Sequence, residues 1–408
     1  MGTLAMKSPL NGIKILELVR VAPGEFCTMM LADMGADVLK IETPPREPST
    51  PDTAEAARLS RRMASRFVNR NKRSIALDLK QPEAQRVLHQ LAADCDVLVE
   101  GFRPGVMSRL GGDYETLSQL NPRLIYCSLS GFGQHGPYRT RPGHDINYLA
   151  LSGVLNLIGQ PGQKPAIPLN LVADYAGATL HGVVGILLAL LARRHTGRGQ
   201  VVDIAYLDTT LSLLAATPIM RHYFSDGHAV SRGAGALGGS YPYYTTYKTA
   251  DGKWLSVACT EPWLWKNFCQ AIGRADLERY ALKPEHHTRA ADSAAVQAKC
   301  EVQAMIRQKS RDAWFAFFQD KNVCVSPVYQ VEETFQDPQV KARDMIADIE
   351  DARYGRIRQT GTAIKLSETP GQIRHLGPSV GEHTDEVLSD LGYDASQRAA
   401  LRQRGAIA

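Results

Sequence analysis

The sequence lacks most of the motifs by which a function is usually recognised. Its seven cysteines include no C-x-x-C pair, which argues against a zinc site or a disulfide framework and favours a reducing compartment. There is no H-E-x-x-H motif and no acidic cluster with calcium-loop spacing, so we predict no metal site. A net charge of +5, spread along the chain without a basic stripe, argues against a nucleic-acid partner.

Long hydrophobic runs are also absent. The most apolar stretch, residues 182–192, precedes two arginines and is too short to span a bilayer, so we expect a buried helix and no membrane partner. The first nine residues hold no apolar core of the signal-peptide kind, and the last three are not a peroxisomal signal. Together these features predict a cytoplasmic protein.

The sequence does contain an alternation of strands and helices. Apolar strands are predicted at residues 12–18, 36–41, 74–79, 96–100 and 124–129, with helices at 24–34 and 82–94 between them. This alternation is typical of a doubly wound α/β domain with a parallel sheet. The turn after the first strand, residues 19–24, lacks the G-x-G-x-x-G fingerprint, so a Rossmann-like sheet with a ligand other than NAD is favoured.

A length of 408 residues suits two domains or one large α/β body with an insertion. We predict that residues 1–221 form most of a large domain, with a helix at 174–191, a strand at 197–206 and a helix at 207–217. A glycine-rich and serine-rich linker follows at 222–240. Residues 241–323 then form a smaller α+β domain, with strands at 243–249 and 254–258 and helices at 262–272 and 292–308. Residues 324–408 are expected to return to the large domain.

Several motifs together identify a family. They are ILELVRVAPG at residues 15–24, LADMGADVLKIE at 31–42, EGFRPGVMSRLG at 100–111, GHDINYLALSGVL at 143–155 and NLVADYAG at 170–177. On these motifs the chain resembles the family III CoA-transferases over almost its full length, and within them the α-methylacyl-CoA racemase branch. The resemblance implies an interlocked homodimer of ring-like chains. Each chain has a Rossmann-like large domain built from both chain ends, and each active site lies between that domain and the partner's small domain.

Two residues are the candidates for acid–base chemistry. Asp174 stands just before an apolar helix, where an aspartate commonly caps the N-terminus, and the resemblance implies that it is the essential catalytic residue. His144 occupies a position where the transferases usually carry Tyr or Phe and the racemases carry His. Inverting the α-carbon of a thioester requires one group to remove a proton and another to return one. We therefore expect Asp174 and His144 to flank that carbon.

Further residues are expected to support this pair. Asp145 either binds a nearby backbone N–H or is an ordinary loop carboxylate. Glu261 is either a first-turn helix acid or, as the resemblance implies, a group that approaches the histidine from the partner chain. Asn170 and Tyr148 match motif positions that line the site. Backbone N–H groups at the start of the helix after Asp174 are candidates for stabilising the enolate oxygen.

Coenzyme A is expected as part of the substrate, with no tightly bound cofactor. Its phosphates call for cationic side chains, and the resemblance implies contacts from Arg103, Arg109, Phe102, Leu77, Lys80, Ala22 and Pro23. The chain departs from the family at Thr43, where many members have an arginine. Arg46 is a candidate substitute, and the stretch 47–63 is longer than in compact racemases.

Three functions remain open on the sequence. The first is a racemase or epimerase of 2-methyl-branched acyl-CoA thioesters. The second is a CoA-transferase that uses Asp174 as nucleophile and passes through an acyl-aspartyl anhydride and an aspartyl-CoA thioester. The third is an acyl-CoA binder without activity, which is disfavoured because His144, Asp174 and Glu261 occur together.

Overall fold

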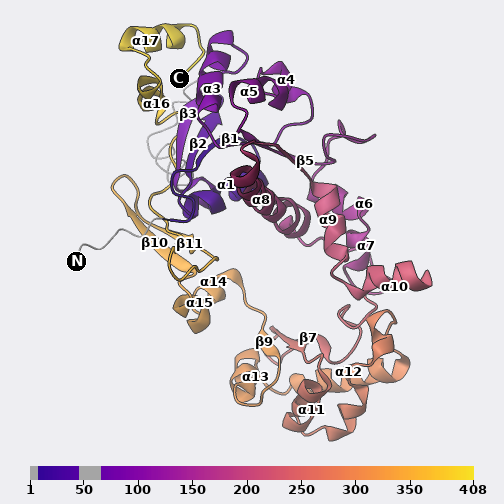
Figure 1. Ribbon diagram of the computed structural model, residues 1–408. Helices are drawn as coiled ribbons and strands as arrows, with labels where there is room; N and C mark the ends of the chain where they lie inside the picture. The colour runs from indigo at the N-terminus through magenta and orange to yellow at the C-terminus, as the bar shows by residue number, and fades with distance from the viewer. Residues whose placement is uncertain (1–7, 46–65) are drawn as a thin grey trace. The chain divides into compact units, whose positions relative to one another are not determined.

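The computed structural model describes residues 8–45 and 66–408, so the predictions for Arg46 and for residues 47–63 lie outside the described residues. The chain divides into two compact units (Figure 1). The first comprises the described part of Met1–Asp145 together with Leu171–Thr209 and Phe335–Ala408. The second comprises Ile146–Asn170 and Thr210–Thr334.

The first unit is built on a six-stranded sheet in which every neighbouring pair is parallel. Its order is β3-β2-β1-β4-β5-β6, so the direction of winding reverses between β1 and β4. The strands are β1 (Lys14–Leu18), β2 (Asp37–Glu42), β3 (Lys72–Ala76), β4 (Val97–Glu100), β5 (Ile125–Ser130) and β6 (Val201–Ala205). The predicted α/β class and parallel sheet are confirmed.

Strands β1 to β5 are buried on both faces, as expected of a parallel sheet covered by helices. Helices α1 (Ala22–Asp33) and α8 (Leu180–Thr196) contact each other, and α8 also contacts β5 and β6 (Figure 1). A separate apolar core joins strand residues such as Leu16 and Leu98 to five helices. These are α3 (Pro82–Ala93), α4 (Val106–Arg109), α5 (Tyr114–Leu120), α16 (Thr384–Asp390) and α17 (Ala395–Gln403).

The C-terminal residues attach to the β3 edge of the sheet. Ile407 forms an antiparallel bridge with Leu77, and the Asp78 N–H donates to the Ala406 carbonyl at 2.9 Å. Ala406 and Ile407 are buried there. The first unit is therefore built from segments that lie far apart in the sequence.

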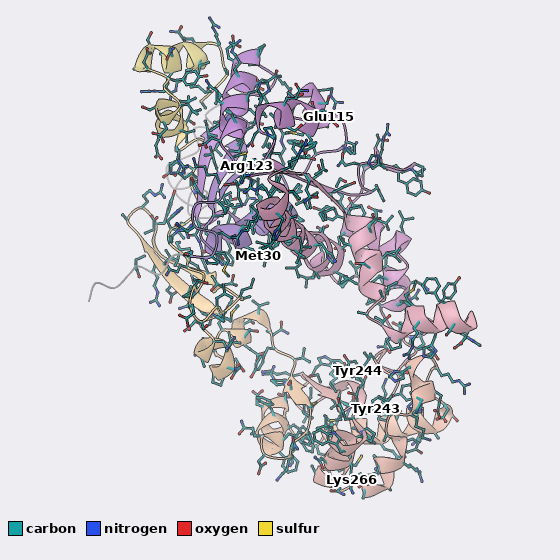
Figure 2. All side chains as sticks on the ribbon, viewed as in Figure 1. Met30, Glu115, Arg123, Tyr243, Tyr244 and Lys266 are labelled. Carbon is teal, nitrogen blue, oxygen red and sulfur yellow. The ribbon has the colours of Figure 1, made fainter. Side chains whose placement is uncertain are left out.

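The second unit contains a three-stranded antiparallel sheet, in the order β7-β8-β9. Its strands are β7 (Tyr244–Lys248), β8 (Trp254–Ala258) and β9 (Val325–Pro327), and its larger helices are α11 (Pro262–Ala271), α12 (Ser293–Ile306) and α13 (Arg311–Phe318). Aromatic side chains dominate its core. Tyr243, which precedes β7 and is labelled in Figure 2, is completely buried there, as are Trp265 and Phe268.

The bounds of these units differ from the predicted domain limits at several points. Residues 146–170 and 210–221, predicted to be part of the large domain, belong to the second unit. Helix α10 (Pro218–Asp226) runs into the predicted linker, because Pro218 begins a helix that ends only at Gly227, whose φ is 69°. Residues 324–334 belong to the second unit instead of returning to the first, because β9 pairs with β8. The return begins at Phe335, followed by the hairpin of β10 (Ile346–Asp351) and β11 (Gly355–Thr360).

The helix predicted to be buried has one exposed face. The π-helix η2 (Leu171–Thr179) continues into α8, and this 26-residue segment is long and apolar enough, by length and composition alone, to cross a membrane. Leu180, Val184, Leu188 and Leu191 recur along α8 at helical spacing and are 42–60% exposed. We call these four residues the α8 stripe. Because other residues of α8 contact β5 and β6, the expectation of burial holds for only part of the helix.

Candidate active site

Asp174 lies inside the π-helix η2 and not at the end of a helix. The predicted N-cap position is therefore wrong, since the helical segment begins at Leu171. Asp174 is half-buried. π-helical turns are rare and are found frequently at functional sites, so the local backbone is consistent with a functional role for this carboxylate.

Asp145, which begins α6 (Asp145–Leu151), takes the capping role that was expected of Asp174. Its Oδ2 accepts hydrogen bonds from the N–H groups of Ala173 at 2.9 Å and Asp174 at 3.0 Å. Asp145 is 4% exposed, and among the described residues its Oδ1 has no hydrogen-bond partner. The alternative of an ordinary loop carboxylate is thus excluded. Because Asp145 occupies the Ala173 and Asp174 N–H groups, these two donors are not available to an enolate oxygen.

Asp145 also positions the backbone of His144 near the start of η2. His144 itself is exposed. The side chain of Asp145 accepts a hydrogen bond from the Asp174 N–H, and His144 is the residue before Asp145. The backbone at His144 is therefore linked to the backbone at Asp174 through Asp145. An imidazole and a carboxylate are two groups able to give and accept a proton near neutral pH.

Helix α1 fixes the segment that carries Asp174. The Thr179 hydroxyl donates to the Pro23 carbonyl at 2.7 Å, and the rings of Phe26 and Tyr175 meet edge to face at 5.5 Å. Pro23 and Ala22, predicted to lie along the path of CoA, form the first turn of α1. The start of α1 and the Asp174 segment therefore lie side by side.

The remaining predicted support residues belong to the second unit. Tyr148 lies in α6 (Asp145–Leu151) and is buried, whereas Asn170 is exposed and immediately precedes η2. Glu261 is exposed at the N-cap of α11 and accepts a hydrogen bond from the Thr260 hydroxyl at 3.0 Å. Its role toward His144 stays a prediction.

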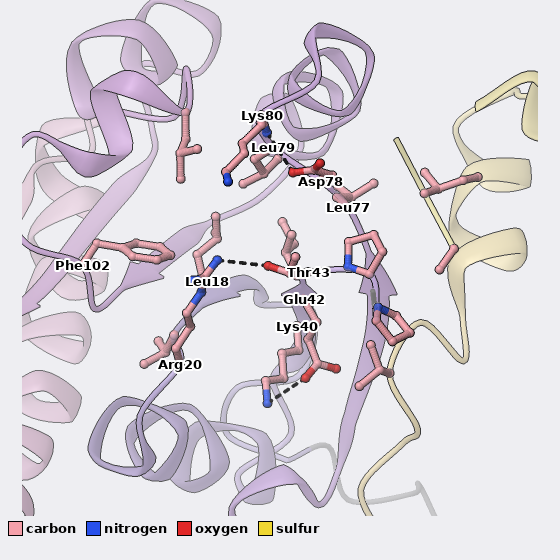
Figure 3. Close-up of a pocket in the computed structure, with 18 of the residues that line it drawn as sticks. Leu18, Arg20, Lys40, Glu42, Thr43, Leu77, Asp78, Leu79, Lys80 and Phe102 are labelled. Carbon is pink, nitrogen blue, oxygen red and sulfur yellow. Dashed lines mark hydrogen bonds and ion pairs between the residues drawn. The ribbon is translucent and has the colours of Figure 1, made fainter. Parts of the chain in front are cut away.

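A cavity of about 800 Å³ opens in the first unit at the carboxyl ends of the strands (Figure 3). Its walls come from the residues after β1, β2, β3 and β4 and from the C-terminal residues Gly405, Ile407 and Ala408. This is where doubly wound sheets bind their ligands.

Three of the predicted CoA contacts line this cavity: Leu77, Lys80 and Phe102. Ala22, Pro23, Arg103 and Arg109 are not among its lining residues, and the two arginines are exposed, before and at the end of α4 (Val106–Arg109).

Among the lining residues that sequence reasoning missed are three cationic side chains, Arg20, Lys40 and Arg66, and the C-terminal Ile407. A lysine within the apolar strand ADVLKIE was a signal for Lys40, whereas nothing in the sequence pointed to Ile407.

Carboxylates neutralise two of the cations in the cavity wall. Lys40 Nζ lies 2.7 Å from Glu25 Oε1 and 3.2 Å from Glu42 Oε1, and Arg66 Nη2 lies 2.7 Å from Glu25 Oε2. Burial alone would raise the pKa of Glu25, but Lys40 and Arg66 outweigh it and hold that pKa below its ordinary value. Glu25 is therefore an anion at neutral pH.

Glu100 holds the turn that carries Phe102. Its Oε2 accepts the Phe102 N–H at 2.7 Å, and its side chain lies at the buried end of β4. Burial raises the pKa of Glu100 to about 7, against which the hydrogen bonds from Ser128 and Phe102 act. Glu100 thus changes its charge near neutral pH.

Five of the seven cysteines are buried. Burial raises the pKa of Cys27, Cys95, Cys259 and Cys269 to about 12, so these side chains are not thiolates at neutral pH. No described cysteine forms a disulfide, and no group of three or more potential metal ligands occurs in residues 8–45 and 66–408.

Comparison with known proteins gives a consistent result. The family model described as CoA-transferase family III matches residues 10–384. The chain is 39% identical over 393 residues to the α-methylacyl-CoA racemase of Mus musculus. This alignment covers 95% of this chain and 94% of the relative. It is 36% identical over 403 residues to the succinate–glutarate CoA-transferase of Agrobacterium fabrum. This second alignment covers 94% of this chain and 96% of the relative. A solved CaiB/BaiF family protein from Brucella suis matches with a TM-score of 0.76 at 30% identity, over 94% of this chain and 100% of that chain.

Proposed function

The chain belongs to CoA-transferase family III, and we propose that it is a racemase of 2-methyl-branched acyl-CoA thioesters. The observation that carries the proposal is the 3.0 Å hydrogen bond from the Asp174 N–H to Asp145. It ties the backbone of one acid–base group to the residue next to the other, His144. The identity to a mammalian α-methylacyl-CoA racemase supports the same reaction.

The reaction follows from the chemistry of the pair. The thioester carbonyl acidifies the α-hydrogen, so one group can remove it and leave an enolate. The other group then protonates the opposite face, which inverts the carbon. Both enantiomers are substrates, because Asp174 and His144 can each act as acid or base. Coenzyme A enters and leaves as part of the substrate, and the reaction needs no other cofactor.

The second candidate function is CoA transfer. Here Asp174 attacks the thioester carbonyl, CoA leaves as the thiolate, and an acyl-aspartyl anhydride remains. The CoA thiolate attacks the aspartyl carbonyl of this anhydride, so the acyl group leaves as its carboxylate and an aspartyl-CoA thioester forms. An acceptor carboxylate then attacks this thioester and takes over CoA through a second anhydride. The 36% identity to a succinate–glutarate CoA-transferase favours keeping this alternative.

We also propose a homodimer as the active form, in a cytoplasmic setting. The α8 stripe supports it, because an exposed apolar row on an enzyme that acts on a water-soluble thioester calls for a protein partner. In an interlocked dimer the large domain of one chain meets the small domain of the other. Glu261 of the second unit would then reach the partner's active site.

The test is deuterium exchange. A 2-methylacyl-CoA incubated in heavy water without any carboxylate acceptor should gain deuterium at its α-carbon. We expect His144→Ala and Asp174→Ala to lower the exchange rate by about 10²–10⁴-fold, the usual contribution of a general acid or base. His228→Ala, at an exposed histidine after α10, is the matched control and should leave the rate unchanged.

Other outcomes separate the rival functions. A transferase shows no exchange until a carboxylate acceptor is added, and it then moves CoA onto that acceptor. It should also tolerate His144→Ala but not Asp174→Ala. A silent binder holds acyl-CoA and shows neither reaction. No exchange with any of several branched acyl-CoAs would falsify the racemase proposal.

A further inference from the structure

Arg20 spans the point at which the sheet reverses its winding. It lies in the turn after β1, and Phe102 lies in the turn after the neighbouring strand β4. The guanidinium carbon of Arg20 lies over the Phe102 ring, 5.3 Å from its centroid. The crevice between two such strands is the usual ligand site of a doubly wound sheet, so Arg20 crosses the place where a ligand is expected.

The start of helix α1 is a poor phosphate site, although it stands where many such folds bind phosphate. Pro23 has no N–H to offer in the first turn. A side-chain carbon at Gly24 would lie 2.4 Å from Val19 Cγ1, so Val19 already fills the space that a glycine turn leaves for a ligand. Glu25 places a buried carboxylate in this first turn. The positive charge for a phosphate must therefore come from a side chain.

Four cationic side chains among the described residues line the cavity: Arg20, Lys40, Arg66 and Lys80. Lys40 and Arg66 form ion pairs with Glu25, and Lys40 forms a second ion pair with Glu42. Within the described part of the chain, neither Arg20 nor Lys80 has a carboxylate within ion-pair distance. The cavity thus keeps two cations whose charge is not already compensated.

Of these two, Arg20 is held in position. Its Nη2 donates to the Thr43 hydroxyl at 3.0 Å, as Figure 3 shows, while Phe102 supports the guanidinium. Thr43 follows β2, so Arg20 links the carboxyl ends of three adjacent strands. Both side chains are exposed, but Lys80 is an ammonium on a flexible stem.

We infer that Arg20 is the residue that binds a phosphate of the CoA nucleotide. A guanidinium has five N–H donors in a planar fork that matches a phosphate bidentately, and Thr43 takes one of them. The phosphate replaces the neutral Thr43 hydroxyl, because a charge-assisted hydrogen bond is the stronger one. Phe102 keeps the fork in the crevice throughout. The inference rests on the proposed function for the identity of the ligand as CoA.

The test is the affinity of the full-length protein for CoA, measured by titration calorimetry. Arg20→Ala should raise the Kd for CoA by about 10- to 100-fold, the usual cost of losing a charged hydrogen-bond partner. The KM for acyl-CoA should rise to the same degree, with little change in kcat, since the phosphate lies away from the reacting carbon. Arg86→Ala, at an exposed arginine of α3, is the matched control and should behave as the unaltered protein.

Truncated ligands test whether the contact is to a phosphate. Acyl-pantetheine has no nucleotide phosphate, so Arg20→Ala should leave its KM unchanged. Dephospho-CoA lacks only the 3′-phosphate. If Arg20→Ala still weakens dephospho-CoA, Arg20 binds the diphosphate, and if the effect disappears, it binds the 3′-phosphate. Either result supports the inference.

Two conservative variants sharpen the test. Arg20→Lys keeps the charge but loses the fork, and its Kd should lie between those of the unaltered protein and Arg20→Ala. Thr43→Val removes the competing acceptor, so CoA should bind as tightly as before or more tightly. Unchanged CoA affinity in Arg20→Ala, or an equal loss with acyl-pantetheine, would overturn the inference. A loss in Thr43→Val as large as that in Arg20→Ala would also overturn it.

The outcomes distinguish this inference from the proposed function. Normal deuterium exchange with unaltered CoA affinity in Arg20→Ala overturns the role of Arg20 alone. Arg20-dependent CoA binding without exchange overturns the racemase reaction and leaves the role of Arg20 in place.

Discussion

Glu100 is a buried carboxyl whose charge depends on the fold. Burial raises its pKa from 4.5 to about 7. Between these values the folded chain binds more protons than the unfolded chain. The free energy of unfolding therefore falls as the pH rises through this window, and the cost is fully present above pH 7. The shift corresponds to about 3 kcal/mol at most.

Glu100→Gln should remove the contribution of this residue to the pH dependence of the free energy of unfolding. An amide keeps an acceptor for the Phe102 N–H without the charge. We expect the free energy of unfolding at pH 8 to increase by up to about 3 kcal/mol, with a smaller gain at pH 5. Urea denaturation at both pH values measures it. Glu115→Gln, at an exposed carboxylate of α5, is the control. A variant less stable than the parent at pH 8 would show that the charged form is the better acceptor.

At the scale of elements, the sequence predicted what local patterns determine. Strand β8 and helix α3 lie at the predicted residues to within one position, because apolar periodicity and a proline at the first helical position define them locally. The start of η2 could not be predicted in this way. Its N–H groups bond to Asp145, which lies 28 and 29 residues earlier in the chain. The same limit applies to the cavity. Leu77 was predicted to contact CoA, but Ile407, which forms the cavity wall next to it, could not be predicted because the two residues pair across distant parts of the sequence.

Asp145→Ala should loosen the start of η2. It leaves the Ala173 and Asp174 N–H groups without their acceptor, so the free energy of unfolding should fall by about 1–3 kcal/mol. Amide hydrogen exchange at Asp174 should accelerate, and racemisation should fall with it.

The control is Asp113→Ala, which removes a comparable acceptor from the Thr116 N–H at the N-cap of α5. It should cost about 1 kcal/mol without altering exchange at Asp174. Equal acceleration at Asp174 in both variants would contradict a local role for Asp145.

At the scale of the whole molecule, the α8 stripe is one of the apolar surfaces that the single chain leaves exposed. A lysine at Val184 or Leu188 places a charge within the apolar row, so it should dissociate a dimer formed through α8. Sedimentation velocity measures the change from dimer to monomer. Val296→Lys, at a 47% exposed position of α12, is the matched control and should remain dimeric. Dimers in all three variants would place the interface elsewhere.

The attachment of Ile407 to Leu77 has a consequence for biosynthesis. A ribosome makes Leu77 long before Ile407, and at about 5–20 residues per second the interval is on the order of tens of seconds. During that time the edge of β3 has no Ile407 beside it, and the cavity lacks one wall. A nascent chain can therefore complete its parallel sheet before all the walls of this cavity are in place.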